Sequence, residues 1–375
     1  MSSTASILRA STTIVKQRIL PHIPKKWLPQ VAFGTNALSL HTLTSCNANA
    51  RMSGLKRGTA ESKMARLLGN ARLPVAIASV VAEFGLVTEY SYVNVDHSDF
   101  SGLVALVFAV QTRIGRALPI FLETSYSGKL SARSDAPKRT KKLRTQYEAL
   151  TDNETKRTIS SLKALRKTLG FWPKLVFDRN FGGRDIVQLL TKQKATFYVR
   201  LKASRLVAGA GINGSIRVSI AKRSDETVVI AGMTLRVIRS PKPKQDATSG
   251  RTGSAATEPW YILTNDLTSS RNKVVKIYYH RFEIEETFRD IKTILGLRRT
   301  KLNKPNSLAI LLWFISLGIL ILYLAGVGCY GVRALRRRLM QSHAKKKLSW
   351  YRILMELREG EVRDVATTYF TGVRR

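Results

Sequence analysis

The stretch from residue 305 to residue 332 carries no charged side chain, and its middle reads LAILLWFISLGILILYLAGVG. A run of this length can span a bilayer as one helix, but a helix that is apolar on every side can also be buried inside a folded domain. Lys and Arg flank the run at both ends, so charge gives no inside–outside asymmetry to orient a membrane segment. We therefore expect a buried core helix, with a single transmembrane span as the alternative.

The charge of the chain indicates its partner. Lys and Arg number 63 against 25 Asp and Glu, a formal net charge of +38 over 375 residues. Such an excess attracts polyanions by counterion release and steering, so nucleic acid is the first candidate and an anionic membrane the second. Cys46 and Cys329 are the only cysteines and form no CxxC motif, which fits a reducing compartment and argues against a zinc site.

The N-terminal region, residues 1–88, is basic and predicted to be helical. Its first 60 residues contain no Asp or Glu, a composition that suits either a transit peptide or, as we favour, an arm laid along DNA. TAESKMARLLGN is predicted to be a helix with Thr59 as a possible cap, and LPVAIASVVAEFG a second helix. We interpret residues 1–88 as a DNA-binding module.

The next 115 or so residues predict a mixed α/β layer. Three apolar runs rich in Val, Ile and aromatic residues predict successive strands, and a helical pattern follows that Asp152 could cap. The predicted strands are 90–97, 103–110, 117–124, 173–178 and 195–204, and the predicted helices are 152–169 and 184–193.

The remaining chain divides into three parts. Residues 204–266 predict a β-rich insertion containing a flexible Pro, Gly and Ser-rich loop. We expect residues 267–330 to complete the α/β core begun over 89–203, and residues 331–375 to form a basic helical tail, either solvated or in contact with DNA or another subunit.

Residues 278–292, YYHRFEIEETFRDIK, gather Glu283, Glu285, Glu286 and Asp290 in a strongly basic chain. At about 100° per residue, a continuous helix aligns one row of side chains within roughly 60°. The row is Tyr278, Arg281, Glu285 and Lys292, and an apolar stripe beside it is Ile284, Phe288, Ile291 and Leu295. The alternative is a solvated helix held by Arg281–Glu285–Arg289 pairs.

Two further acids follow apolar strands. Asp96 ends the predicted strand YVNVD and Asp178 ends KLVFD, and catalytic groups often occupy such positions in α/β folds. A strand-end Asp is also a common turn or cap residue. Two such aspartates and a helix Glu could form an all-oxygen site for Mg²⁺.

The spacing Tyr278-x2-Arg281-x3-Glu285-x6-Lys292 resembles the YREK signature of bacterial DDE transposases of the insertion-sequence-four family. FDRNFGG resembles the second-aspartate motif of that family, and WYILTN resembles the strand that closes its β insertion. The resemblance extends over about residues 60–328.

The resemblance implies an RNase H-like catalytic core with the β-rich insertion before the last catalytic helix, and a buried helix at the apolar run. It implies cut-and-paste transposition through a DNA hairpin, with Asp96, Asp178 and Glu285 as the catalytic triad holding two Mg²⁺ ions, for which Mn²⁺ could substitute. Tyr278, Arg281 and Lys292 would bind phosphates, and Trp260 would stack on an extruded base. The implied partners are double-stranded transposon-end and target DNA and a second subunit in a homodimer, in a bacterial cytoplasm at the nucleoid.

Some positions leave alternatives open. Asp99 could take the first catalytic position, although we prefer Asp96 because it directly ends the predicted strand. Asp185 is spaced too far from Asp178 to be carried over, and Trp260 could equally be a core residue. Two rival functions remain: a non-catalytic DNA-binding remnant of such an element, and a basic membrane protein.

Overall fold

A computed structural model describes most of the central chain in two compact units. Its described residues are 25–38, 55–70, 73, 86–100, 102–112, 116–126, 154–202, 206–209, 217–219, 225–230, 232–241, 259–293, 295–297 and 302–328. Unit 1 comprises Met1–Leu86, His97–Arg144 and Glu283–Arg375, and unit 2 comprises Val87–Asp96 and Thr145–Phe282. The predicted helix at 73–85, apart from Leu73, the proposed cap Asp152 and the tail 331–375 lie outside the described residues.

Unit 2 is built on a sheet whose centre is parallel. The first half of β1 pairs in parallel with β4, and β4 with β5. β10 pairs antiparallel with both β5 and β9, so the strands after residue 204 continue the sheet that contains β1, β4 and β5. From β1 onward, the hydrogen-bonded order is β1 (Tyr92–Phe100), β4 (Lys174–Phe177), β5 (Phe197–Leu201), β10 (Tyr261–Thr264), β9 (Met233–Arg239), β8 (Asp225–Ile230), β6 (Leu206–Gly209) and β7 (Arg217–Ser219).

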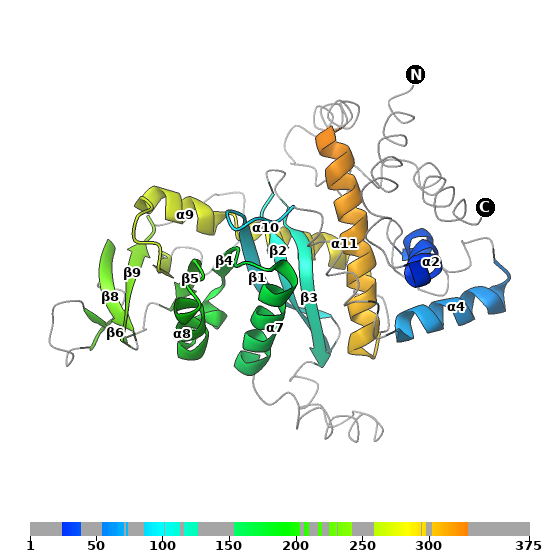
Figure 1. Ribbon diagram of the computed structural model, residues 1–375, viewed down its shortest axis with the longest axis horizontal. Helices are drawn as coiled ribbons and strands as arrows, with labels where there is room; N and C mark the ends of the chain where they lie inside the picture. Colours follow the sequence, from blue (N-terminus) through cyan, green and yellow to red (C-terminus); the bar gives the residue numbers. More distant parts are fainter. Residues whose placement is uncertain are drawn as a thin grey trace. The chain divides into compact units, whose positions relative to one another are not determined.

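The helices of unit 2 follow from amphipathic patterns. In α8 (Arg184–Lys192), Ile186, Val187 and Leu190 are buried while Arg184 and Asp185 are exposed, an apolar stripe at helical spacing. α8 lies beside α7 (Glu154–Leu169) (Figure 1), and the short helix η5 (Arg179–Phe181) follows β4. α9 (Arg271–Tyr279) packs on β9 and β10, closing a core that contains Val176, Tyr198, Ile238, Ile262, Val274, Ile277 and Tyr278.

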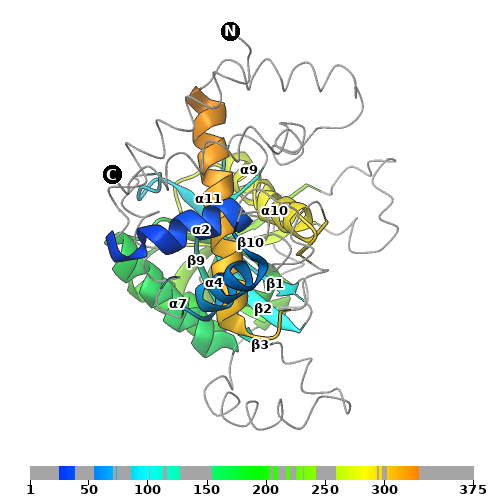
Figure 2. The ribbon, with the colours of Figure 1, turned by 90° about the vertical axis from the view of Figure 1, so that its right-hand side faces the viewer.

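Unit 1 packs around the long helix α11 (Pro305–Gly328). α11 lies on the hairpin of β2 (Leu103–Val110) and β3 (Leu118–Tyr126), and α2 (Leu28–Leu38) and α4 (Arg57–Gly69) lie against α11 (Figure 2). The short helix η3 (Lys25–Trp27) precedes α2, and α10 (Phe282–Thr293) belongs to this unit from Glu283 onward. Every residue from Ser307 to Leu320 is buried, so this part of the apolar run is a core helix, as its sequence favours.

Among the residues whose side chains the structure describes, which for α11 end at Leu320, no helix has both the length and the apolar character needed to span a bilayer.

A glycine brings α2 close to α11. A β-carbon built on Gly34 would lie 2.1 Å from the ring of Phe314, far inside the distance at which carbon atoms attract each other. The hydrogen atom of Gly34 therefore allows an approach that no larger residue permits. The N-terminal region thus contributes to the core of unit 1 as well as carrying positive charge.

Three boundaries differ from the prediction. β1 continues through Phe100, because buried Ser98 and Phe100 alternate with exposed Asp99 in the period of a strand, so Asp96 lies within the strand instead of ending it. Thr59 is inside α4, whose cap position is Lys56. Residues 278–292 are not one helix, since α9 ends at Tyr279 and α10 begins at Phe282.

Candidate active site

Asp96 and Asp178 follow a register pair on two neighbouring parallel strands of unit 2, β1 and β4. Val95 on β1 is in register with Phe177 on β4, and the two aspartates are the residues that follow this pair. Asp178 also takes the cap position of η5, with no capping hydrogen bond from its side chain. The register therefore brings together two acids that are 82 positions apart in the sequence.

The two carboxylates share one cation, the guanidinium of Arg281. Arg281 Nη1 lies 3.4 Å from an oxygen of Asp96, and Nη2 lies 4.0 Å from an oxygen of Asp178. The side chain of Arg281 is only 4% exposed. Since a buried charge is costly unless it is compensated, the two aspartates are what permits this arginine to be buried here.

An aromatic cluster surrounds the same arginine. The guanidinium carbon lies 5.6 Å from the ring centre of Tyr278 and 5.0 Å from that of Phe282, within the range of cation–π attraction. Trp260, which is partly buried, contacts both rings, with centroids 5.3 and 5.6 Å away. Burial, with the negative charge of Asp178 adding to it, raises the pKa of Tyr278 above its usual value, against the opposing effect of Arg281.

Asn94 places the junction between α9 and α10. Its buried Nδ2 donates to the carbonyl of His280 at 3.2 Å and lies 3.5 Å from that of Arg281. A carbonyl at the end of a helix needs such a partner. Asn94 therefore stabilises the break between α9 and α10 and holds the backbone at Arg281 in place. Asn94 was not among the site residues predicted from the sequence. The available signal was a polar residue between Val93 and Val95, all three of which are buried.

Glu285 and Lys292 lie on α10 in unit 1. Both are partly exposed, and Lys292 Nζ stands 4.9 Å from the ring centre of Phe100. Because α10 starts at Phe282, Tyr278 and Arg281 do not lie on the same helix as Glu285 and Lys292. The prediction that these four residues form one row on a continuous helix is therefore wrong. The convergence of Glu285 with Asp96 and Asp178 stays a prediction.

The apolar stripe beside the row is confirmed. Ile284, Phe288 and Ile291 are buried on α10, and Leu295 is buried just after it.

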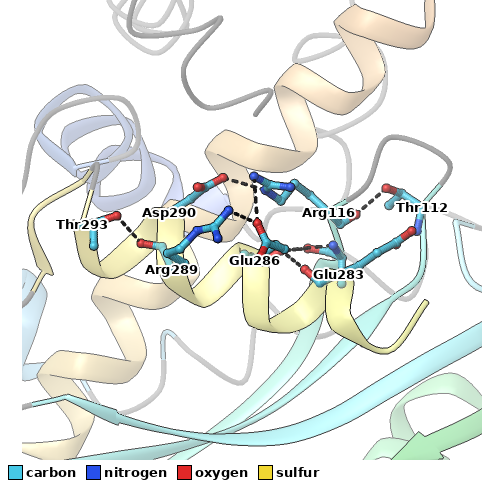
Figure 3. A network of polar contacts seen from close by, with 9 residues as sticks. Thr112, Arg116, Glu283, Glu286, Arg289, Asp290 and Thr293 are labelled. Carbon is cyan, nitrogen blue, oxygen red and sulfur yellow. Dashed lines mark hydrogen bonds and ion pairs between the residues drawn. The ribbon is translucent and has the colours of Figure 1, made fainter. Parts of the chain in front are cut away.

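The other acids of α10 have structural partners (Figure 3). Arg116, between β2 and β3, donates from Nε to Asp290 at 2.7 Å and has Nη2 3.4 Å from Glu286. Glu283 accepts the backbone N–H of Thr112 at 2.8 Å. Glu283 and Asp290 are buried, so the acids are not simply a solvated helix face. Sequence spacing could not show this, because Arg116 precedes Asp290 by 174 positions.

The residues fit a hard cation in part. Carboxylate oxygens are the ligands that Mg²⁺ prefers, and those of Asp96 and Asp178 already converge on one positive group, the guanidinium of Arg281. Within the described part of the chain, however, no group of three or more His, Cys, Asp or Glu side chains is arranged to hold a metal ion. Arg281 lies where such a cation would be placed.

One comparison with known proteins bears on this site. Residues 149–322 match the transposase DDE domain family. The match supports a DDE transposase, and it covers Asp178, Trp260, Arg281 and Glu285 but begins after Asp96.

Other comparisons add less. Among solved structures, the chain is similar to a piggyBac transposase in a synaptic complex with hairpin DNA, at 12% identity and a TM-score of 0.43, covering 99% of this chain and 78% of that one. A TM-score this low does not establish a shared fold. No curated protein matches the chain.

Proposed function

We propose that this protein is a DDE transposase of the insertion-sequence-four type, which binds transposon ends and performs cut-and-paste transposition through a hairpin. The observation that carries the proposal is the pair of register-adjacent aspartates converging on one cation. The match of residues 149–322 to the transposase DDE domain and the spacing of the YREK residues support it. The parallel β1–β4–β5 centre is compatible with an RNase H-like core.

Asp96, Asp178 and Glu285 are the proposed catalytic carboxylates, and they would hold the metal ions. Mg²⁺, when bound, would supply Lewis-acid chemistry at the scissile phosphate and lower the pKa of a bound water. Asp96 on β1 and Asp178 directly after β4 contribute carboxylates from neighbouring strands. Glu285, on α10, is proposed as the third carboxylate of the set.

The proposed DNA contacts involve residues that are buried here to different degrees. Lys292 is partly exposed and can meet a phosphate directly, whereas Arg281 and the fully buried Tyr278 can do so only if the site opens. The guanidinium of Arg281 would then bind a DNA phosphate in place of the carboxylates of Asp96 and Asp178, so that one anionic partner replaces another. Trp260 is partly exposed, so stacking on an extruded base remains compatible with its packing in the core.

The net charge of +38 supports binding to duplex DNA, and we propose that the N-terminal module and a homodimer take part. Affinity for random duplex should fall steeply as salt rises. Deleting the arm up to residue 58 would remove α2, which packs on α11. Replacing exposed Lys25 and Lys26 with Gln is therefore the better test: reduced affinity supports the DNA-contact role, and unchanged affinity contradicts it.

The deciding experiment measures strand cleavage of DNA carrying the ends of the element, with Mg²⁺, with Mn²⁺ and without metal. Asp96→Ala, Asp178→Ala and Glu285→Ala should each abolish cleavage and leave DNA binding intact. Asp185→Ala, which changes an exposed acid seven positions after Asp178, is the matched control. Binding without any metal-dependent cleavage by the parent protein would favour the non-catalytic remnant. Cleavage by the Asp96→Ala protein would transfer the first position to Asp99.

A further inference from the structure

We propose that the contacts around Arg116 set the rotation of α10 about its axis and so position Glu285. Arg116, Asp290, Glu283 and Thr287 are thus positioning residues, and together with Thr112, Ala117 and Glu286 we call them the Arg116 network. The inference rests on the proposed function, because it takes Glu285 to be a catalytic carboxylate.

The network joins α10 to the connection between β2 and β3 at successive positions along the helix (Figure 3). At the start of the helix, the N–H of Thr112 donates to Glu283 at 2.8 Å, and the N–H of Ala117 donates to the carbonyl of Glu283 at 3.2 Å. One turn later, the hydroxyl of Thr287 donates to the carbonyl of Ala117 at 2.9 Å. Arg116 then binds Asp290 and Glu286 nearer the end. A helix bonded along two turns cannot rotate without losing several contacts.

These contacts come from one face of the helix. At about 100° per residue, Glu283, Glu286, Thr287 and Asp290 fall within roughly 100° of one another. Glu285 lies about 150° from the centre of that face, and Lys292 lies close to Glu285. The network therefore fixes the side of α10 opposite to Glu285. This division explains why the acids are adjacent in sequence and differ in role.

Small rotations would matter for Glu285. A side chain ends about 5–6 Å from the helix axis, so a rotation of 20° would move its carboxylate by about 2 Å. Displacements near 1 Å can reduce catalysis by about 100-fold. The ion pair with Asp290 is suited to prevent this, since the carboxylate is 4% exposed and its arginine 13%. Such a pair is desolvated and short, unlike a mobile surface pair.

The test compares Arg116→Gln with Arg236→Gln. Arg236 forms an ion pair of the same 2.7 Å length with Asp225 in unit 2, so its loss controls for the removal of an arginine pair. We expect Arg116→Gln to lower kcat for cleavage by about 10- to 100-fold and to weaken Mn²⁺ binding, measured by calorimetry, about 10-fold. KM for DNA should not change. Arg116→Lys should restore part of both losses, because it keeps the charge without the fork.

Thr287→Val is the milder variant, which keeps the shape of the side chain and removes its hydroxyl. It should shift Mn²⁺ binding in the same direction as Arg116→Gln, even if the latter does not fold. The inference is overturned if Thr287→Val, or a folded Arg116→Gln, loses thermal stability yet binds Mn²⁺ and cleaves DNA like the parent.

Glu285→Ala distinguishes a failure of the positioning role from a failure of the proposed catalytic role. If Glu285→Ala abolished cleavage while the Arg116 network variants bound Mn²⁺ like the parent, only the positioning role would be rejected. Full cleavage by Glu285→Ala would reject the proposed catalytic role, and the positioning role with it.

Discussion

Arg116 in unit 1 and Arg281 in unit 2 each lie between two carboxylates, but with different geometry. Arg116 contacts Asp290 at 2.7 Å and Glu286 at 3.4 Å, whereas Arg281 is 3.4 Å from Asp96 and 4.0 Å from Asp178. The 2.7 Å bond from Arg116 to Asp290 is a short charge-assisted hydrogen bond, which is strong and directional, whereas Arg281 makes one longer hydrogen bond, to Asp96, and a 4.0 Å ion pair with Asp178. An arginine between two carboxylates thus forms a structural contact in unit 1, whereas in unit 2 we propose that a metal ion can take the place of the arginine.

The largest effect expected from this difference is on cleavage. Asp178→Asn should reduce strand cleavage by about three decades or more, as loss of a member of a catalytic set does. Asp290→Asn should reduce it by about one to two decades through mispositioning. Single-turnover cleavage of end-containing DNA measures both. Equal losses would remove the distinction between the two arginine sites.

The second difference concerns metal and stability. Arg281→Met leaves Asp96 and Asp178 as neighbouring like charges and should destabilise the protein by about 1–3 kcal/mol. Mg²⁺ at about 100 times its Kd should restore about 2.7 kcal/mol. Arg116→Met should lose similar stability without recovery, since Arg116 is not at the proposed metal site. Thermal melting with Mg²⁺ and with a chelator measures this, and equal recovery in both variants would contradict it.

A third difference concerns the DNA end. Arg281→Ala should weaken the hold on the reacting end by about 1.5–3 kcal/mol, or one to two decades, and impair hairpin formation more than nicking. Arg281→Lys should rescue only in part, because the bidentate fork is lost. Arg116→Ala should reduce nicking and hairpin formation in parallel. An assay that measures nicking and hairpin formation separately compares the two variants. If Arg281→Ala reduced nicking and hairpin formation equally, Arg281 would have a structural role, as Arg116 does.

Tyr278 next to Arg281 provides a sharper test of the same site. Its hydroxyl is buried and has no hydrogen-bond partner among the described residues. Tyr278→Phe should therefore leave the melting temperature unchanged or slightly raised, because an unsatisfied polar group costs stability. If the hydroxyl meets a phosphate during the reaction, hairpin formation should still fall. A strong loss of stability would show that the hydroxyl serves the fold instead.

The smallest effect is expected at Asp266, an acid held by uncharged donors. It accepts from the Tyr198 hydroxyl at 2.7 Å and from the N–H of Ser269 at 2.9 Å. Burial alone would raise the pKa of Asp266, but hydrogen bonds from Ser269, Tyr198 and Thr268 outweigh it and lower that pKa well below its usual value.

This lowered pKa sets the sign of a pH effect. The ionised carboxylate stabilises the fold above the unfolded pKa of about 3.9, and this contribution is lost as pH falls toward the folded value. Asp266→Asn should therefore reduce the melting temperature at pH 7, with the gap from the parent narrowing below about pH 4. A constant gap would exclude this source of stability.

Local patterns predicted most of the regular elements. β2 has the bounds 103–110 expected from its apolar run, and α8 and β5 follow the predicted periodicity. The predicted bounds are wrong where contacts with residues distant in the sequence determine where an element ends. β1 runs past Asp96 because Ser98 and Phe100 are buried there, and the helix at 278–292 is interrupted where Asn94 donates to the carbonyl of His280.

By itself, the sequence determined the net charge, the apolar helix and the identities and spacing of the acids. It could not assign partners to those acids, because ion pairs such as Arg116–Asp290 and Arg281–Asp96 join residues more than 170 positions apart. Tertiary structure decided that Glu283 and Asp290 serve the fold while Asp96 and Asp178 share a cation. The physical reason is that carboxylates have the same intrinsic chemistry, and only burial and the nearest positive group determine what each one can do.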